Sequence, residues 1–217
     1  MLNTYFTVRG DGSEQIVIQK SRFIGYVTRA ETEEEAKEFI QQIKKKHHDA
    51  THNCSAYMIG EHDQIQKAHD DGEPSGTAGV PILNVLKQKG LKDTVVVVTR
   101  YFGGIKLGAG GLIRAYSSTT SETLHTTGIV KRQLMRTMNV TADYSLLGKL
   151  ENELRSSTYI IKKIEYLEHV VIEVYVEEGN EDVFSTWIVD LTSDQATITS
   201  GDVSYMEIDV TPDHKGE

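Results

Sequence analysis

The 217-residue sequence has a single cysteine, Cys54, and no apolar run long enough to cross a membrane. One cysteine excludes an intrachain disulfide and a cysteine-rich zinc site. A membrane-spanning helix needs about 20 predominantly apolar residues, and the N-terminus lacks the basic-then-apolar pattern of a signal peptide. We therefore expect a cytoplasmic protein that does not associate with a membrane.

The common catalytic and nucleotide-binding motifs are also missing. Gly103 and Gly108 have the spacing of a Walker A loop, but the Lys-Ser/Thr pair does not follow. The dinucleotide fingerprint fails because Ile113 stands where its third glycine belongs. The eight histidines show no H-E-x-x-H spacing, and Ser75 lies in Pro-Ser-Gly rather than G-x-S-x-G. We therefore predict no catalytic residue, no metal and no cofactor, and we expect Cys54 to be a buried thiol.

Composition and charge describe a folded protein of two unlike parts. Hydrophobic residues make up 38% and charged residues 25%, which is typical of globular domains. Residues 1–141 carry 18 Lys and Arg against 15 Asp and Glu, a balance of +3, whereas residues 142–217 carry 5 against 17, a balance of −12. This shift predicts two folding units. A polyanion would bind the first unit, and the acidity of the second either repels that ligand or only maintains solubility.

Residues up to about 140 alternate short strands with helices. Gly10-Asp11-Gly12 suggests a hairpin, and Thr32 with Glu35 forms a capping box that starts a helix. Alternation from His52 predicts a strand buried on one face only. The expected strands are 4–8, 15–19, 22–28, 52–59, 64–68, 94–99 and 130–140, and the expected later helices follow the loop at 70–79 and run from about 111 to 126.

The remaining residues predict a simpler pattern. A strand at 138–142 precedes a helix capped by Asp143, strands follow at 160–165 and 170–176, and Asn180 caps a second helix before a strand at 203–208. This βαββαβ order is the ferredoxin-like arrangement. The chain as a whole is therefore predicted to be α+β.

Two polar loops, 70–79 and 103–111, each open a helix and are the strongest functional signal. The second holds five glycines in nine positions, with Lys106 inside it and Arg100 and Arg114 at its flanks. Glycine permits close approach to the main chain, and a helix N-terminus attracts anions. The loops therefore predict a cradle for phosphate or an RNA backbone, although glycines at such turns also serve helix packing alone.

Carboxylates and aromatics near these loops leave alternatives open. Asp70, Asp71 and Glu73 suit a magnesium ion, but we favour turn and capping roles for them. The cations and the aromatic residues Tyr101 and Phe102 together resemble an RNA-reading surface. Phe102, like Tyr116, equally suits a place in the core.

These motifs resemble a known family. The sequences DDGEPSGTAG at 70–79 and RYFGGIKLGAGGLIRAY at 100–116 look like the hallmark of the IMPACT family, in its bacterial YigZ-like branch. KSRF at 20–23 and ATHNC at 50–54 fit the same family. The resemblance implies an N-terminal domain over 1–137 similar to domain 2 of ribosomal protein S5. It also implies a ferredoxin-like domain over 138–217 similar to domain V of elongation factor G.

The tandem order of these domains implies binding to RNA or the ribosome. Eukaryotic relatives are translational regulators that bind the activator of an amino-acid-starvation kinase through an additional N-terminal domain, so the kinase role is not carried over. Our first hypothesis is a non-enzymatic, translation-associated regulator or factor. The alternatives are an enzyme or binding protein for a small phosphorylated or nucleotide ligand, and a protein-interaction module. The candidate ligand- or RNA-binding residues are Arg22, Asp70, Asp71, Glu73, Ser75, Gly76, Thr77, Arg100, Tyr101, Phe102, Gly103, Gly104, Lys106, Gly108, Gly110, Gly111 and Arg114.

Overall fold

The computed structural model describes residues 1–210, which form two compact units. The first unit contains residues 1–131 together with the chain from Ile208 on, and the second contains Arg132–Glu207. Residues 211–217, which the sequence analysis assigns to the C-terminal domain, lie outside the described residues. Within the described part of the chain, no helix is both long and apolar enough to cross a membrane.

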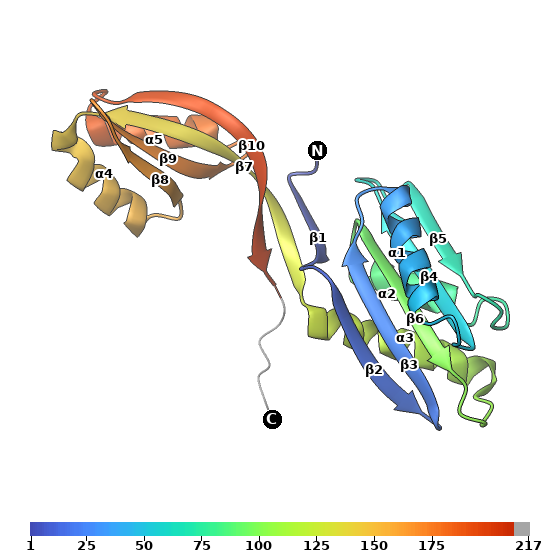
Figure 1. Cartoon of the computed structure of the whole chain (residues 1–217). Coiled ribbons are helices and arrows are strands. Elements are labelled where there is room, and N and C mark those ends of the chain that lie inside the picture. Colours follow the sequence, from blue (N-terminus) through green and yellow to red (C-terminus); the bar gives the residue numbers. More distant parts are fainter. Residues whose placement is uncertain (211–217) are drawn as a thin grey trace. The chain divides into compact units, whose positions relative to one another are not determined.

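A five-stranded antiparallel sheet forms the centre of the first unit (Figure 1). The middle strand carries four consecutive valines at 95–98 that are fully buried, as its β-branched sequence predicts. In spatial order the strands are β2 (Gly12–Ile18), β3 (Ser21–Arg29), β6 (Thr94–Tyr101), β4 (His52–Ile59) and β5 (Ile65–His69).

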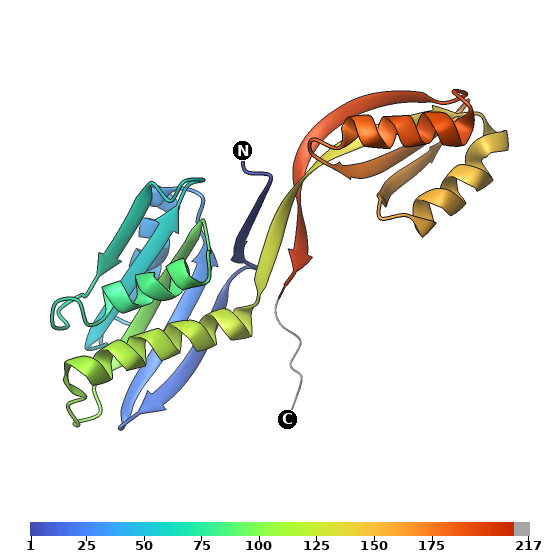
Figure 2. The same ribbon diagram turned by 180° about the vertical axis from the view of Figure 1, so that it is seen from behind.

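Three helices cover the two faces of this sheet (Figures 1 and 2). They are α1 (Glu33–Lys46), α2 (Gly79–Gln88) and α3 (Gly108–Thr127). α1 packs on one face through an apolar stripe, while α2 and α3 share a core on the other. The capping box of Thr32 and Glu35 is confirmed at the start of α1.

β4 corrects one expectation. The sequence predicts one buried face, but all but the first of its eight residues are buried. Tyr57 packs in the cluster beneath α1, and Cys54 and Ala56 belong to the core beneath α2 and α3. Alternating polarity misleads here because Asn53 and Ser55 are polar residues that α1 nevertheless covers.

The tight hairpin of the sheet lies at a different place from the predicted one. The turn predicted at 10–12 follows β1 (Thr4–Val8), but β1 lies outside this sheet and β2 pairs with β3. The turn consists of Gln19 and Lys20, whose φ angles of 45° and 66° are both positive, as a two-residue turn that follows strand twist requires. The break expected between the strands at 15–19 and 22–28 lies here, but neither residue is a glycine or asparagine that would indicate a tight turn.

The second unit has the predicted βαββαβ order. Leu150, Leu154, Phe184 and Ile188 of its helices form the core with the strands. The elements are β7 (Ile129–Ala142), α4 (Tyr144–Ser156), β8 (Ile160–Tyr166), β9 (Val170–Glu177), α5 (Glu181–Thr192) and β10 (Thr197–Asp209). The strand order β10-β7-β9-β8, with antiparallel β7/β9 and β9/β8 pairs, completes the ferredoxin-like arrangement and confirms the α+β class.

β7 is one continuous strand where the sequence suggests two, at 130–140 and 138–142. Its first residues belong to the first unit and the remainder to the second. The expected domain boundary between 137 and 138 therefore falls inside a strand, and that boundary stays a prediction. The chain passes from one unit to the other without a loop.

Candidate functional site

The first polar loop, 70–79, is organised by Asp70. Its carboxylate accepts hydrogen bonds from the backbone N–H groups of Gly76 (2.8 Å), Ala78 (3.1 Å) and Gly79 (2.8 Å). Although partial burial by itself raises the pKa of Asp70, these three hydrogen bonds outweigh it and hold the pKa below its usual value. The N–H groups that the sequence offers to a phosphate are thus occupied by this carboxylate, which acts as the anion at the start of α2.

The other polar residues of this loop also have internal partners. Asp71 accepts from Lys44 Nζ (2.6 Å) and from the backbone N–H of Asn53 (2.7 Å), and Thr77 Oγ1 donates to the carbonyl of Pro74 (2.6 Å). Ser75 is exposed. Among the described residues, no three or more His, Cys, Asp or Glu side chains group as metal ligands do.

Glu73 and Arg100 form a buried ion pair beneath the loops. Arg100 Nη1 lies 2.6 Å from Glu73 Oε1, and both side chains are almost fully buried. Tyr116 donates its hydroxyl to the same carboxylate oxygen at 2.8 Å. Arg100, predicted to face an anion at the surface, is therefore neutralised inside the protein, and Tyr116 takes the core place that was one of its two expected places.

Cys54 lies beside this network and is buried, as predicted. Its thiol donates to the carbonyl of Asp70 (2.9 Å) and lies 3.3 Å from the Tyr116 hydroxyl. Burial raises the pKa of the Cys54 thiol far above its ordinary value. A nucleophilic thiolate is not available at this position.

The second loop is shorter than its sequence suggests, because α3 begins at Gly108 rather than near Gly111. Gly108, Gly110 and Gly111 therefore lie in the first helical turn. Gly103 packs so tightly on the β2–β3 turn that a Cβ would collide with the Lys20 carbonyl group. Such close approach requires glycine.

The other glycines of this loop differ in their backbone roles. Gly104 and Gly108 have φ angles of 87° and 69°, which side chains rarely adopt. A Cβ at Gly111 would press on the Leu107 side chain at 2.9 Å. Gly110 is the exception, because its nearest neighbour would be Arg114 Nη1 at 3.6 Å. Nothing in the folded protein explains a glycine at this position.

The N-terminus of α3 is uncapped. Leu107 is its N-cap residue, no side chain caps the exposed backbone N–H groups, and the first turn holds no acidic residue. α1 and α4 are capped by Thr32 and Asp143, whereas the N-cap residues of α2 and α5 make no side-chain capping hydrogen bond. The cap predicted at Asn180 is therefore wrong, although Asn180 is the N-cap residue of α5. With Lys106 directly before the helix, this end of α3 has the positive potential that an anion favours.

A cavity of about 360 Å³ lies between the two loops. The predicted loops therefore do form one surface. Most of the wall is apolar, and the ring of Phe102, 46% exposed, stands 5.5 Å from the Arg100 guanidinium. Leu107 and Leu112, which also line the wall, were not among the predicted site residues, because their only signal is their position on either side of the helix start. The cavity is lined by Glu73, Pro74, Arg100, Phe102, Lys106, Leu107, Gly108, Ala109 and Leu112.

Of the three exposed cations in and beside the loops, Lys106 lines this cavity, Arg114 lines a neighbouring cavity with Leu107 and Gly111, and Arg22 lies at the start of β3. Arg22 lies over the ring of Tyr101 at 4.3 Å, and Arg22, Lys106 and Arg114 form no ion pair within the described residues. The Tyr101 hydroxyl contacts His47 Nδ1 (2.8 Å) and donates to Asp49 (3.1 Å). We call Arg22, Phe102, Lys106, Arg114 and the first turn of α3 the loop face.

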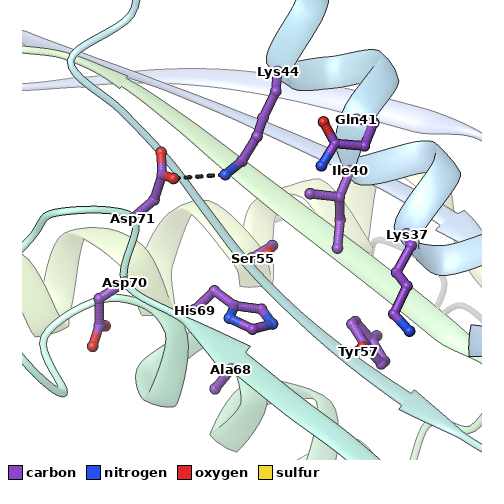
Figure 3. Close-up of a pocket in the computed structure, with 10 residues that line it drawn as sticks. All are labelled: Lys37, Ile40, Gln41, Lys44, Ser55, Tyr57, Ala68, His69, Asp70 and Asp71. Atoms are coloured by element: carbon purple, nitrogen blue, oxygen red, sulfur yellow. Dashed lines mark hydrogen bonds and ion pairs between the residues drawn. The ribbon is translucent and has the colours of Figure 1, made fainter.

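A second cavity, of about 430 Å³, lies between α1 and the β4–β5 hairpin (Figure 3). Its cations are already paired: Lys44 with Asp71, drawn as a dashed line in Figure 3, and Lys37 with Glu33 at 3.3 Å. The hydroxyl of Ser55 is buried there without a hydrogen-bond partner among the described residues. Paired cations make this cavity a weaker anion site than the loop face. It is lined by Lys37, Ile40, Gln41, Lys44, Ser55, Tyr57, Ala68, His69, Asp70 and Asp71.

Fold and site together define a two-unit α+β protein with a cavity between two glycine-containing loops. Residues 19–124 match the Impact N-terminal domain, and residues 140–195 match a domain of unknown function, DUF1949. The chain belongs to the IMPACT family, as its motifs predict.

Relatives of similar length support this assignment. The chain is 60% identical over 207 residues to the IMPACT family member YvyE of Bacillus subtilis, covering 95% of each chain. It is 33% identical over 177 residues to the IMPACT family member YigZ of Escherichia coli, covering 81% of this chain and 87% of that one. A crystal structure of a hypothetical protein superposes with a TM-score of 0.60 at 28% identity, covering 93% of this chain and 99% of that one.

Proposed function

We propose that this protein binds RNA of the translation apparatus through the loop face. One observation carries the proposal: Lys106, which forms no ion pair among the described residues, lines one cavity with an exposed phenylalanine and the uncapped N-terminus of α3. Proteins that bind single-stranded RNA combine cations for the backbone with aromatic rings for the bases. The proposal places this activity in the cytoplasm, and the link to translation comes from the family resemblance.

Charge distribution supports the same face. The chain carries a net charge of −9, but residues 1–141 have a balance of +3. A polyanion is repelled by the acidic residues after 141 and attracted to the loop face. The loop carboxylates Asp70, Asp71 and Glu73 are held by internal hydrogen bonds and ion pairs, so the proposal is binding without catalysis.

The experiment removes the three cations together in R22A/K106A/R114A. Binding of ribosomal RNA, followed by fluorescence anisotropy over a salt series, is expected to weaken most at low salt. Each lost phosphate contact lowers the slope of log affinity against log salt by about 0.7 to 0.9, so the triple variant should lose about two units of slope. Arg100 is left intact because it supports the fold.

A matched control removes three other exposed lysines of the first unit, in K67A/K87A/K89A. Its net charge equals that of the R22A/K106A/R114A variant, so general electrostatic attraction changes equally in both. The control should retain most of the wild-type affinity and slope. Equal binding by the two triple variants contradicts the assignment of RNA binding to the loop face.

A second candidate is a small phosphorylated or nucleotide ligand held at the same loops. The cavity of about 360 Å³ favours it, because pockets of a few hundred Å³ suit small molecules. Free nucleotides with magnesium should then raise the melting temperature at millimolar concentration. If nucleotides raise the melting temperature and the protein does not bind RNA, this candidate is favoured over the first.

A further inference from the structure

Arg100, one of the residues that line the cavity between the loops, carries a buried hydrogen-bond donor without an acceptor among the described residues. Arg100 is 5% exposed, its Nη1 pairs with Glu73 at 2.6 Å and its Nη2 lies 3.5 Å from Ser21 Oγ. Its Nε is buried and has no partner within residues 1–210. A buried donor without a partner costs free energy, so an acceptor gains a hydrogen bond there once the side chains that cover Nε move aside.

The walls above this donor suit a flat apolar group. Pro74, Leu107, Ala109 and Leu112 contribute apolar surface, and Phe102 stands beside them with nearly half of its surface exposed. Aromatic rings in such positions stack on other rings. An aromatic ligand in the cavity would cover the exposed ring of Phe102.

The mouth of the cavity suits an anion. Gly108 and Ala109, from the uncapped first turn of α3, line it together with Lys106. Gly110, in the same turn, has room for a side chain among the described residues. A glycine here lets an outside group approach the backbone closely, which matches the approach of a phosphate to helix N–H groups.

We propose that the cavity takes one unstacked nucleotide of a single-stranded RNA, an inference that rests on the proposed RNA-binding function. The base lies against Phe102 with a ring nitrogen or carbonyl oxygen accepting from Arg100 Nε. The phosphate lies at the N-terminus of α3 beside Lys106. The donor, the apolar walls and the mouth of the cavity thus match, in that order, the hydrogen-bond acceptor, the flat ring and the phosphate of one nucleotide.

A peptide ending in an apolar side chain and a carboxylate shares two of these features but lacks the third. Its backbone carbonyls can accept a hydrogen bond as a nucleobase does, but an aliphatic side chain offers no flat ring to stack on Phe102. A single donor does not discriminate strongly among the bases. The proposal therefore predicts recognition of unpaired nucleotides with little sequence preference.

The proposal is tested by comparing single-stranded and duplex RNA of equal length on wild-type protein and the F102A variant. A paired base cannot enter the cavity, so duplex affinity should be unchanged by F102A. Single-strand affinity should fall about tenfold, the size of one lost base–aromatic contact. The control F6A removes another exposed phenylalanine of the first unit and should leave both affinities unchanged.

Two further measurements separate stacking from damage to the fold. The variant F102W keeps an aromatic ring and should retain single-strand affinity, while unchanged circular dichroism and melting temperature show that F102A is folded. On wild-type protein, uridine 5′-monophosphate should shift NMR signals of residues 102–112. Uridine without phosphate and ribose 5-phosphate without a base should each shift them much less.

The outcomes distinguish this inference from the proposed function. If single-stranded RNA binds equally well to wild-type, F102A and F6A proteins, the nucleotide cavity is wrong while RNA binding stands. If neither single-stranded nor duplex RNA binds, the proposed function is wrong, and so is the proposal that the cavity takes a nucleotide of RNA. If peptides with an apolar C-terminal residue shift the same signals and uridine monophosphate does not, the ligand class is wrong.

Discussion

At the residue scale, three buried side chains at the base of the loops stabilise the folded protein, whether or not a ligand is bound. Glu73 holds Arg100 at 2.6 Å and accepts from the Tyr116 hydroxyl at 2.8 Å, and all three side chains are buried. Removing one partner of such an ion pair leaves a buried charge without compensation. The network therefore fixes where Arg100 and the strand end beneath the loop face lie.

The substitution E73Q tests this role. Glutamine keeps the shape and can still accept from Tyr116, but it leaves the Arg100 guanidinium unneutralised. We expect a loss of about 3–5 kcal/mol in the free energy of unfolding, measured by urea denaturation. The exposed Glu38, changed in E38Q, should cost less than about 0.5 kcal/mol. A loss for E73Q as small as that of E38Q would contradict a stabilising ion pair.

His47 makes the stability depend on pH. It is buried between the Tyr26 hydroxyl at 2.7 Å and the Tyr101 hydroxyl at 2.8 Å. Burial, assisted by the charges of Lys46 and Arg22, lowers the pKa of His47 below its ordinary 6.5. The unfolded chain therefore binds a proton near pH 6.5 that the folded protein does not bind.

The free energy of unfolding should consequently fall as the pH drops below about 6.5. Urea denaturation from pH 7.5 to 5.0 measures this slope, and H47Q should remove the part that His47 contributes. H48Q, a change at the exposed neighbour, should keep the wild-type slope. Asp70 and Asp71, whose pKa values are lowered from 3.8, lose their contribution only below that pH, so the two effects are separable. A slope that H47Q leaves unchanged contradicts this account.

At the scale of elements, the start of α3 lacks two features that commonly stabilise a helix. It lacks a side-chain cap and contains Gly110, which has room for a side chain. A glycine within a helix costs about 0.5–1 kcal/mol relative to alanine. No contact of Gly110 among the described residues offsets that cost.

G110A should therefore raise the free energy of unfolding by about 0.5 kcal/mol or more and weaken RNA binding at the same time. The chain offers a matched control in Gly148 of α4, where a Cβ also meets nothing within 4 Å. G148A should stabilise without changing RNA affinity. If G110A binds RNA as tightly as G148A does, the α3 N-terminus does not contact the ligand.

Elements with local signals were predictable from sequence. The capping box at Thr32, the cap at Asp143 and the valines of β6 each fix their element through nearby residues. The start of α3 was misplaced because its glycines have low helix propensity, whereas the fold places them in the first turn. The sequence predicted that the two polar loops share one surface. It did not predict that Asp70 would accept hydrogen bonds from the backbone N–H groups of loop 70–79, because this depends on how the loop folds back and residue spacing does not show that.

At the scale of the whole molecule, acidic residues concentrate in the C-terminal part of the chain. Residues 142–217 carry a balance of −12, against +3 for the residues before them. A single RNA-binding face near Arg22, Lys106 and Arg114 is consistent with a chain whose overall charge of −9 would otherwise repel RNA. RNA contacts should accordingly concentrate in the first unit.

Ultraviolet cross-linking of the full chain to ribosomal RNA, with the modified peptides identified by mass spectrometry, tests this central claim most directly. The account predicts adducts on the peptide that contains Phe102, because this ring belongs to the loop face. The adducts should disappear in R22A/K106A/R114A and persist in K67A/K87A/K89A. Adducts confined to residues 142–210, or adducts that survive in R22A/K106A/R114A, would contradict it.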